Sequence, residues 1–159
     1  MTIGLSLPLG YLAGTNDSAD AMCFYEAFGQ PRDCLADLKD NGNGTVSDTT
    51  TGLAWTLSAD LAKGGKDAAD TKVFVAKFNA SAAFGHKDWR LPTREEMLKL
   101  ADPANREPAL PNWSPFESVS GWYRTSTPDW GVDMDTGIPW SSGQAGKKLA
   151  KIWLVREAE

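Results

Sequence analysis

Hydrophobic and polar positions alternate on either side of a polar turn over residues 45–56. The runs 45–47 and 53–56 are strand-like, and residues 48–52 between them are turn-forming. Two Asn-Gly steps within 40–44 give a second turn signal directly before the first run. The pattern therefore predicts a β-hairpin over 45–56.

The spacing of apolar residues becomes helical after Asp70. These residues recur every three or four positions, at Phe74, Val75, Phe78 and Ala82. The spacing predicts a helix over about 71–83, with Asp70 as the N-cap and a stop near Gly85.

A capping signal then predicts a second helix over about 94–101. Thr93 is followed three residues later by Glu96, which is the spacing of a capping box. The preceding aromatic and proline should bury an indole and fix the entry of the chain. We expect structural roles for Trp89, Arg90, Pro92, Thr93 and Glu96.

The last part of the chain reads as strands separated by long loops. Residues 121–126 and 129–134 are patterned as a strand pair, and 150–156 as a closing strand. Between them lie a loop at 102–120 with four prolines and a Gly/Ser-rich loop at 135–148. The sum is an α+β fold of two helices with antiparallel sheets and long loops.

The length of 159 residues fits one domain. We divide the chain into an N-terminal arm, 1–20, and a single domain, 21–159. The apolar start 1–14 lacks a basic first segment and is interrupted by Pro8 and Gly10, so we expect it in the mature chain. No apolar run approaches the ~18 residues of a membrane span, which predicts no membrane insertion.

The net charge of −5 narrows the range of partners. Affinity for phosphate backbones comes largely from lysine and arginine, so we expect no nucleic-acid partner. The acidic balance also argues against strongly sulfated glycans.

Two cysteines, Cys23 and Cys34, flank a turn signal at 29–31. A hairpin there would bring the sulfurs together as a disulfide, which implies an oxidising compartment. Two free thiols, or a metal or catalytic role, are the alternatives.

Several strings in order resemble one family. They are 40–48, 51–55, Asp88-Trp89-Arg90-Leu91-Pro92-Thr93 with Glu96, 121–126 and the closing Val155-Arg156. The set is similar to the C-terminal domain of a bacterial collagen-like adhesin (the Lcl C-terminal-like domain, of unknown function). The resemblance covers about residues 20–157 and extends to the C-type-lectin-like and sulfatase-modifying-factor folds.

The resemblance implies a C-type-lectin-like fold whose terminal strands meet and whose ligands bind on long loops. It also implies an extracellular or cell-surface location, with the periplasm as an alternative, and a homo-oligomer such as a trimer. The adhesin relative recognises host glycosaminoglycans. The enzymes of the wider group use a late pair of cysteines, and this chain has no cysteine after Cys34. We therefore expect no enzyme activity and no cofactor other than calcium.

Calcium is one interpretation of the oxygen-rich turn over 40–48. Its candidate ligands are Asp40, Asn41, Asn43 and Asp48. The run does not match the EF-hand pattern, because Gly42 and Gly44 stand at its third and fifth positions. A plain turn held by Asx hydrogen bonds is the alternative.

The candidate ligand-binding residues lie in or beside the later loops. They are Trp113, Trp130, Trp140, Lys147 and Lys148. Exposed indoles stack on sugar rings or form protein contacts, and Trp140 is the best candidate because its loop is otherwise small and polar. His86, the single histidine, is expected to be a solvated loop residue.

The sequence thus predicts a non-catalytic adhesion module whose ligand is a cell-surface carbohydrate or protein. The alternative is an assembly subunit of a surface fibre, pilus or phage-like particle. In that case the arm 1–20 and the loops would contact neighbouring protomers.

Overall fold

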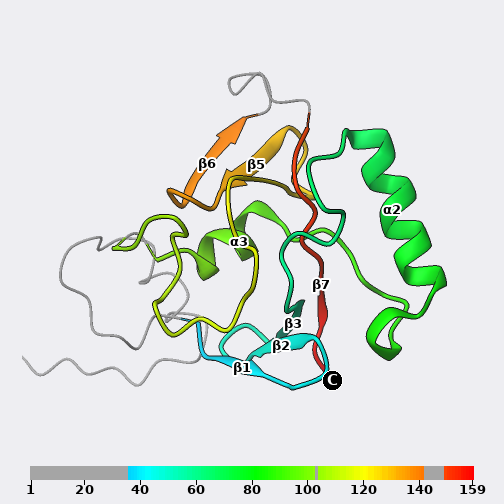
Figure 1. The fold of residues 1–159 in the computed structure, drawn as a ribbon, viewed down its shortest axis with the longest axis horizontal. Helices are drawn as coiled ribbons and strands as arrows, with labels where there is room; N and C mark the ends of the chain where they lie inside the picture. Colours follow the sequence, from blue (N-terminus) through cyan, green and yellow to red (C-terminus); the bar gives the residue numbers. More distant parts are fainter. Residues whose placement is uncertain (1–35, 103, 142–148) are drawn as a thin grey trace, which may run out of the picture. The chain divides into compact units, whose positions relative to one another are not determined.

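Two antiparallel sheets and two α-helices make up the part of the chain that the computed structural model describes, residues 36–102, 104–141 and 149–159 (Figure 1). These residues fall within one compact unit, Leu35–Glu159. The arm 1–20 and the cysteine hairpin with Cys23 and Cys34 lie outside the described residues. The α+β class is confirmed.

The first sheet has four strands in the order β1-β2-β3-β7. Their bounds are Leu38–Asp40 for β1, Thr45–Asp48 for β2, Leu53–Thr56 for β3 and Val155–Glu157 for β7. The hairpin over 45–56 is confirmed as β2 and β3, with Val46 opposite Trp55. The pattern did not predict β1, which is short and mostly exposed. The last strand, β7, pairs with β3, so β1 and β7 are the two edge strands of this sheet.

Helix α2, Ala68–Ala80, begins three residues earlier than predicted. Its N-cap is Asp67, whose carboxylate accepts a 2.8 Å hydrogen bond from the amide of Asp70. Asp70 is therefore a first-turn residue, where a carboxylate also interacts favourably with the helix dipole. A short 3-10 turn, η2, follows at Ala83–Gly85.

Helix α3, Arg94–Leu100, starts at the predicted capping box. Thr93 Oγ1 accepts from the amide of Glu96 at 3.1 Å, and Glu96 Oε2 accepts from the amide of Thr93 at 2.8 Å. Both bonds satisfy amides that no helical carbonyl reaches. Met97 and Leu100 are buried.

The second sheet has three strands in the order β4-β5-β6. Their bounds are Trp122–Arg124 for β4, Trp130–Asp133 for β5 and Ile138–Ser141 for β6. Strand β6 corrects the prediction of a loop over 135–148. A tight turn after β5 reverses the chain and allows β6 to pair with β5. In this turn Asp133 Oδ1 accepts from the amide of Asp135, and Gly137 has a positive φ. Pro139 interrupts the strand pattern in the sequence, but β6 is an edge strand, where a proline is tolerated.

The closing strand is likewise shorter than the predicted 150–156. Residues 150 and 151 make only isolated bridges to Lys66 and Tyr123, and the regular ladder begins at Val155. The sequence 152–155 is nevertheless completely buried. Its apolar run therefore reflects burial on both sides rather than a longer strand.

Two hydrophobic clusters form the core. The larger one packs α3 and both sheets around Trp55, Tyr123 and Trp153. The smaller one consists of Trp89, Ile152 and Leu154, covered by Phe74, Val75 and Phe78 of α2. Figure 1 accordingly shows α2 beside the red segment that leads into β7. Phe74, Val75 and Phe78 of the predicted stripe thus form the packing side of α2, whereas the predicted Ala82 lies beyond the end of the helix with a positive φ.

Four tryptophans are buried, including Trp89, whose burial the sequence predicted. They are Trp55, Trp89, Trp122 and Trp153. Among the described residues, no helix is long and apolar enough to cross a bilayer.

Candidate functional site

The outer face of the first sheet carries a row of polar side chains. Side chains alternate across a strand, so Val46, Trp55 and Val155 point into the core. Their neighbours Ser47, Ala54 and Arg156 are aligned by the strand register on the other face. This face is where the functional groups gather.

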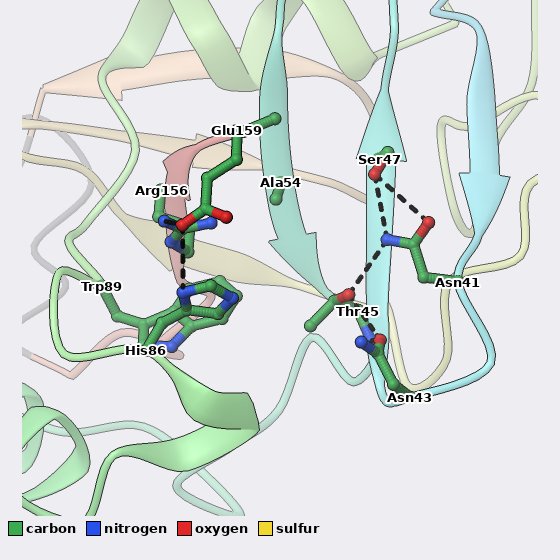
Figure 2. Close-up of a pocket in the computed structure, with 10 residues that line it drawn as sticks. Asn41, Asn43, Thr45, Ser47, Ala54, His86, Trp89, Arg156 and Glu159 are labelled. Carbon is green, nitrogen blue, oxygen red and sulfur yellow. Dashed lines mark hydrogen bonds and ion pairs between the residues drawn. The ribbon is translucent and has the colours of Figure 1, made fainter.

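A pocket of about 170 Å³ lies on this face and is named here the hairpin pocket. Three segments far apart in the sequence line it: the β1–β2 hairpin, the loop before α3, and the end of the chain (Figure 2). The lining residues are Asn41, Asn43, Thr45, Ser47, Ala54, His86, Trp89, Arg156, Ala158 and Glu159. Most of them are hydrogen-bonding side chains.

One wall of the pocket is a ladder of amides and hydroxyls. Asn41 Nδ2 donates to Thr45 Oγ1 at 3.0 Å and to Ser47 Oγ at 2.9 Å. Asn43 Oδ1 accepts from the Thr45 hydroxyl at 2.6 Å and from its amide at 3.1 Å. Among the described residues no partner is recorded for Asn43 Nδ2, and the Asn43 side chain is exposed. That amide group is available to a ligand.

The opposite wall carries charges. Arg156 Nε donates to Asp88 Oδ1 at 2.8 Å, and Arg156 Nη2 lies 3.5 Å from Glu159 Oε1. The hydrogen bond from Arg156 holds the pKa of Asp88 below its usual range, and the same bond raises the pKa of Arg156. His86 Nδ1 lies 4.0 Å from Glu159 Oε1. Arg156 is only 9% exposed, so its charge is held by these carboxylates rather than by bulk water.

Local backbone geometry holds the two walls together. Asn79 of α2 brackets Trp89, donating to its carbonyl at 2.8 Å and accepting from its amide at 2.9 Å. Trp89 Nε1 donates to the carbonyl of Ala83. The ring of Phe84 lies directly against Gly44, where a Cβ would overlap it. The glycine thus allows η2 to touch the hairpin turn.

The structure places the predicted ligand-binding residues elsewhere. Trp140 is 42% exposed on strand β6, and Trp113 is 53% exposed in the 102–120 loop. Trp130 is half-buried, with the guanidinium of Arg94 4.6 Å from its ring centroid. Lys147 and Lys148 lie outside the described residues. None of the three tryptophans lines the hairpin pocket.

Trp130 and Trp140 also point in different directions. Trp130 is opposite Ser141 and Gly131 is opposite Trp140, so the two indoles are one ladder position apart and lie on opposite faces of the sheet. They therefore do not form one stacking surface.

The 102–120 loop is anchored to both sheets. The amide of Ala109 donates to Met134, and the segment around Glu117 exchanges hydrogen bonds with Leu57 and Ala59. Ala109 and Leu110 are buried. The loop is a structural part of the domain that presents Trp113.

The calcium candidates use their oxygens in turns. Asp40 Oδ1 accepts from the amide of Gly42 at 2.8 Å, and Asp48 accepts from the amide of Thr50 and the hydroxyl of Thr51. Asp48 is buried on the face of β2 that carries Val46, away from the pocket. No group of three or more His, Cys, Asp or Glu fit for a metal occurs in the described part of the chain. The Asx-turn alternative is observed, and the calcium site stays a prediction.

A serine–lysine pair outside the pocket was not recognised in the sequence. Lys151 Nζ lies 2.8 Å from Ser120 Oγ, a pairing that some hydrolases use for nucleophilic attack. Asp60 Oδ2 lies 3.5 Å from the same nitrogen, so Lys151 bridges Ser120 and Asp60. We interpret the three side chains as a clamp between loops.

The main features that sequence reasoning missed are this clamp and the hairpin pocket. The pocket depends on strand register, which aligns Arg156 with Ala54 and Ser47 across three strands. The family resemblance includes both 40–48 and 155–156, so the sequence singled out these segments of the pocket. It did not predict that they lie on the same face of one sheet.

The sequence model of a family described as the Lcl C-terminal domain matches residues 44–156, well over half of the chain. No curated protein matches the chain, and no solved structure matches it. The matched range includes β2, β3 and Arg156, but the hairpin residues Asn41 and Asn43 precede it.

Proposed function

Because the chain belongs to the Lcl C-terminal domain family, we propose that it is a surface-associated, adhesin-type binding module without catalytic activity. Its ligand in this proposal is a cell-surface glycan, and the hairpin pocket is the binding site. The proposal moves the site from the later loops, where the sequence placed it, to the outer face of the first sheet.

The convergence of polar groups in the hairpin pocket is the observation that carries this proposal. A sugar presents hydroxyls that both donate and accept, so its site needs mixed donors and acceptors held in place. The pocket offers the free amide of Asn43, the ring nitrogens of His86 and the carboxylate of Glu159. The ladder and the Arg156 ion pairs hold these walls before a ligand arrives, which lowers the entropic cost of binding.

The absence of catalysis is part of the proposal. His86, the single histidine of the chain, lies beside Trp89 and Glu159, and the serine of the same pocket, Ser47, is hydrogen-bonded to Asn41.

The direct test is a glycan array followed by titration calorimetry on the bound glycan. We expect His86→Phe, which keeps the ring beside Trp89 but removes both nitrogens, to weaken binding by about ten-fold, or roughly 1.4 kcal/mol. Asn43→Asp keeps the turn acceptor but removes the free amide, and should weaken binding similarly.

Trp140→Ala is the matched control, because it removes the exposed indole that the sequence favoured. Unchanged binding by Trp140→Ala supports the pocket. Loss of binding in Trp140→Ala with both pocket variants unaffected would place the ligand on the second sheet. A folded protein that binds no glycan on the array would refute the proposal.

A second candidate function is protomer contact in a homo-oligomer. Ile138 and Trp140 are both more than two-fifths exposed and lie two residues apart on edge strand β6, so they share one face. Paired apolar side chains of this kind favour a protein contact. Light scattering on the wild type, on Trp140→Ala and on a chain lacking 1–16 tests it. A monomer in all three would remove its support.

A further inference from the structure

We infer that the hairpin pocket selects an uncharged sugar residue over an anionic one, because Asp88 and Glu159 neutralise Arg156, the guanidinium of its described lining. The inference rests on the proposed glycan-binding function and names the class of ligand.

Charge is the first step. Arg156 is the only lysine or arginine among the described residues that line the pocket. Asp88 takes its Nε at 2.8 Å, and Glu159 lies 3.5 Å from its Nη2. Formal charges of one guanidinium and two carboxylates sum to −1 with His86 neutral. A sulfate or carboxylate entering the pocket would meet a net negative surrounding rather than a free cation.

Hydrogen-bonding capacity is the second step. The pocket presents acceptors as well as donors, since Glu159 is 83% exposed and accepts only. A sulfate also accepts only, so it leaves the carboxylate without a donor and adds repulsion. A hydroxyl donates to the carboxylate and accepts from the Asn43 amide. The lining therefore fits a polyol.

Size is the third step. Pockets for drug-sized ligands measure about 300–1,000 Å³, whereas this one has about 170 Å³. It accommodates a ligand near the size of one sugar ring. The ligand class is accordingly a single uncharged residue, such as a neutral hexose or N-acetylhexosamine, at the end of or projecting from a longer glycan.

Asp88→Asn isolates the charge effect. Asparagine keeps an oxygen that accepts from Arg156 Nε while removing the negative charge, and Asp88 is 57% exposed, so the fold should tolerate it. Glu95→Gln is the matched control, because Glu95 pairs with Arg94 at 2.7 Å and is 51% exposed outside the pocket. Both variants change the net charge by the same amount.

The probes are N-acetylglucosamine and its 6-sulfate, titrated by ligand-observed NMR with heparin as a polyanionic probe. We expect the wild type and Glu95→Gln to bind the neutral sugar about ten-fold more tightly than its sulfate. Asp88→Asn should close or reverse this gap. Neutral-sugar binding should change little between low and physiological salt.

The outcomes separate the two proposals. A wild type that prefers the sulfated sugar or heparin overturns the neutral-ligand inference and leaves glycan binding intact. A neutral preference that persists in Asp88→Asn overturns the role of Arg156 neutralisation. If the wild type binds neither the neutral nor the sulfated monosaccharide, and no glycan on the array, both the inference and the proposed glycan-binding function are overturned.

Discussion

Asp88 Oδ1 accepts a 2.8 Å hydrogen bond from Arg156 Nε and so joins the loop before α3 to the last strand. Two residues further on, Arg90 and Val155 exchange backbone hydrogen bonds of 2.9 Å in both directions. The recognisable string around Trp89 is therefore a partner of β7 as well as the entry to α3. A motif that identifies the fold also forms one wall of the hairpin pocket.

Thr93→Ala should lower the free energy of unfolding by about 1 kcal/mol, because it removes the acceptor for the Glu96 amide at the start of α3. Thr93→Ser keeps that acceptor and should stay within about 0.5 kcal/mol of wild type. Urea denaturation followed by tryptophan fluorescence measures both. Equal losses in the two variants would contradict a capping role.

Glu96→Gln should flatten the acid dependence of stability. Burial raises the pKa of Glu96, but hydrogen bonds from Arg90 and from the Thr93 amide outweigh it and bring the pKa below its ordinary 4.5. The folded state then binds fewer protons than the unfolded state near that pH, so stability is full above about pH 4.5 and is lost as the pH falls through the lower folded pKa.

Denaturation curves collected between about pH 3 and pH 7 check this prediction. At neutral pH the variant should be less stable by about 1.5–3 kcal/mol, since Glu96 accepts from Arg90 at 2.9 and 2.8 Å. The difference from wild type should shrink toward pH 3. A constant difference over the whole range would show that Glu96 acts only through packing.

Gly44→Ala should destabilise more than Gly42→Ala. Both glycines have positive φ, +86° and +72°, so alanine costs about 1 kcal/mol at either position. Only at Gly44 does the new methyl overlap the Phe84 ring, whereas open space surrounds Gly42. In thermal denaturation, Gly44→Ala should therefore have a lower melting temperature than Gly42→Ala and the wild type.

The double variant Gly44→Ala with Phe84→Ala separates strain from overlap. Once the ring is gone, the excess cost of Gly44→Ala should disappear, which a double-mutant cycle measures as coupling. Additive effects would mean that the Phe84 ring moves aside freely when a methyl group is added at Gly44.

Trp153→Phe should cost more stability than Trp55→Phe, although both indoles are completely buried. Trp153 Nε1 donates to the carbonyl of Thr56 at 2.9 Å, whereas the buried Trp55 Nε1 has no hydrogen-bond partner in the described part of the chain. The difference should be about 1–3 kcal/mol, because only one substitution breaks a buried hydrogen bond. Equal losses in denaturant would indicate that Trp55 Nε1 has a partner in solution.

Local signals explain the parts of the fold that the sequence predicted. The Thr93–Glu96 box, the hairpin over 45–56 and the stripe of α2 each depend on residues close together in the chain. Asp67 was missed as the N-cap because Asp70 carries the same signal, and only the backbone geometry distinguishes them.

Long-range pairing explains the parts that the sequence did not predict. Trp140 was assigned to a loop because Pro139 interrupts its strand, which an edge position tolerates. The hairpin pocket needs Arg156 in register with Ala54 and Ser47, and no local pattern specifies that register. The candidate site was therefore accessible only through the sheet.

The pairing of β3 with β7 sets the order of events during synthesis. Trp55 pairs with Val155, so β3 must wait for residues made about 100 positions later. At about 5–20 residues per second this delay lasts about 5–20 s. Throughout it β3 lacks its β7 partner and the larger core lacks Trp153, so the first sheet is completed only at the end of synthesis.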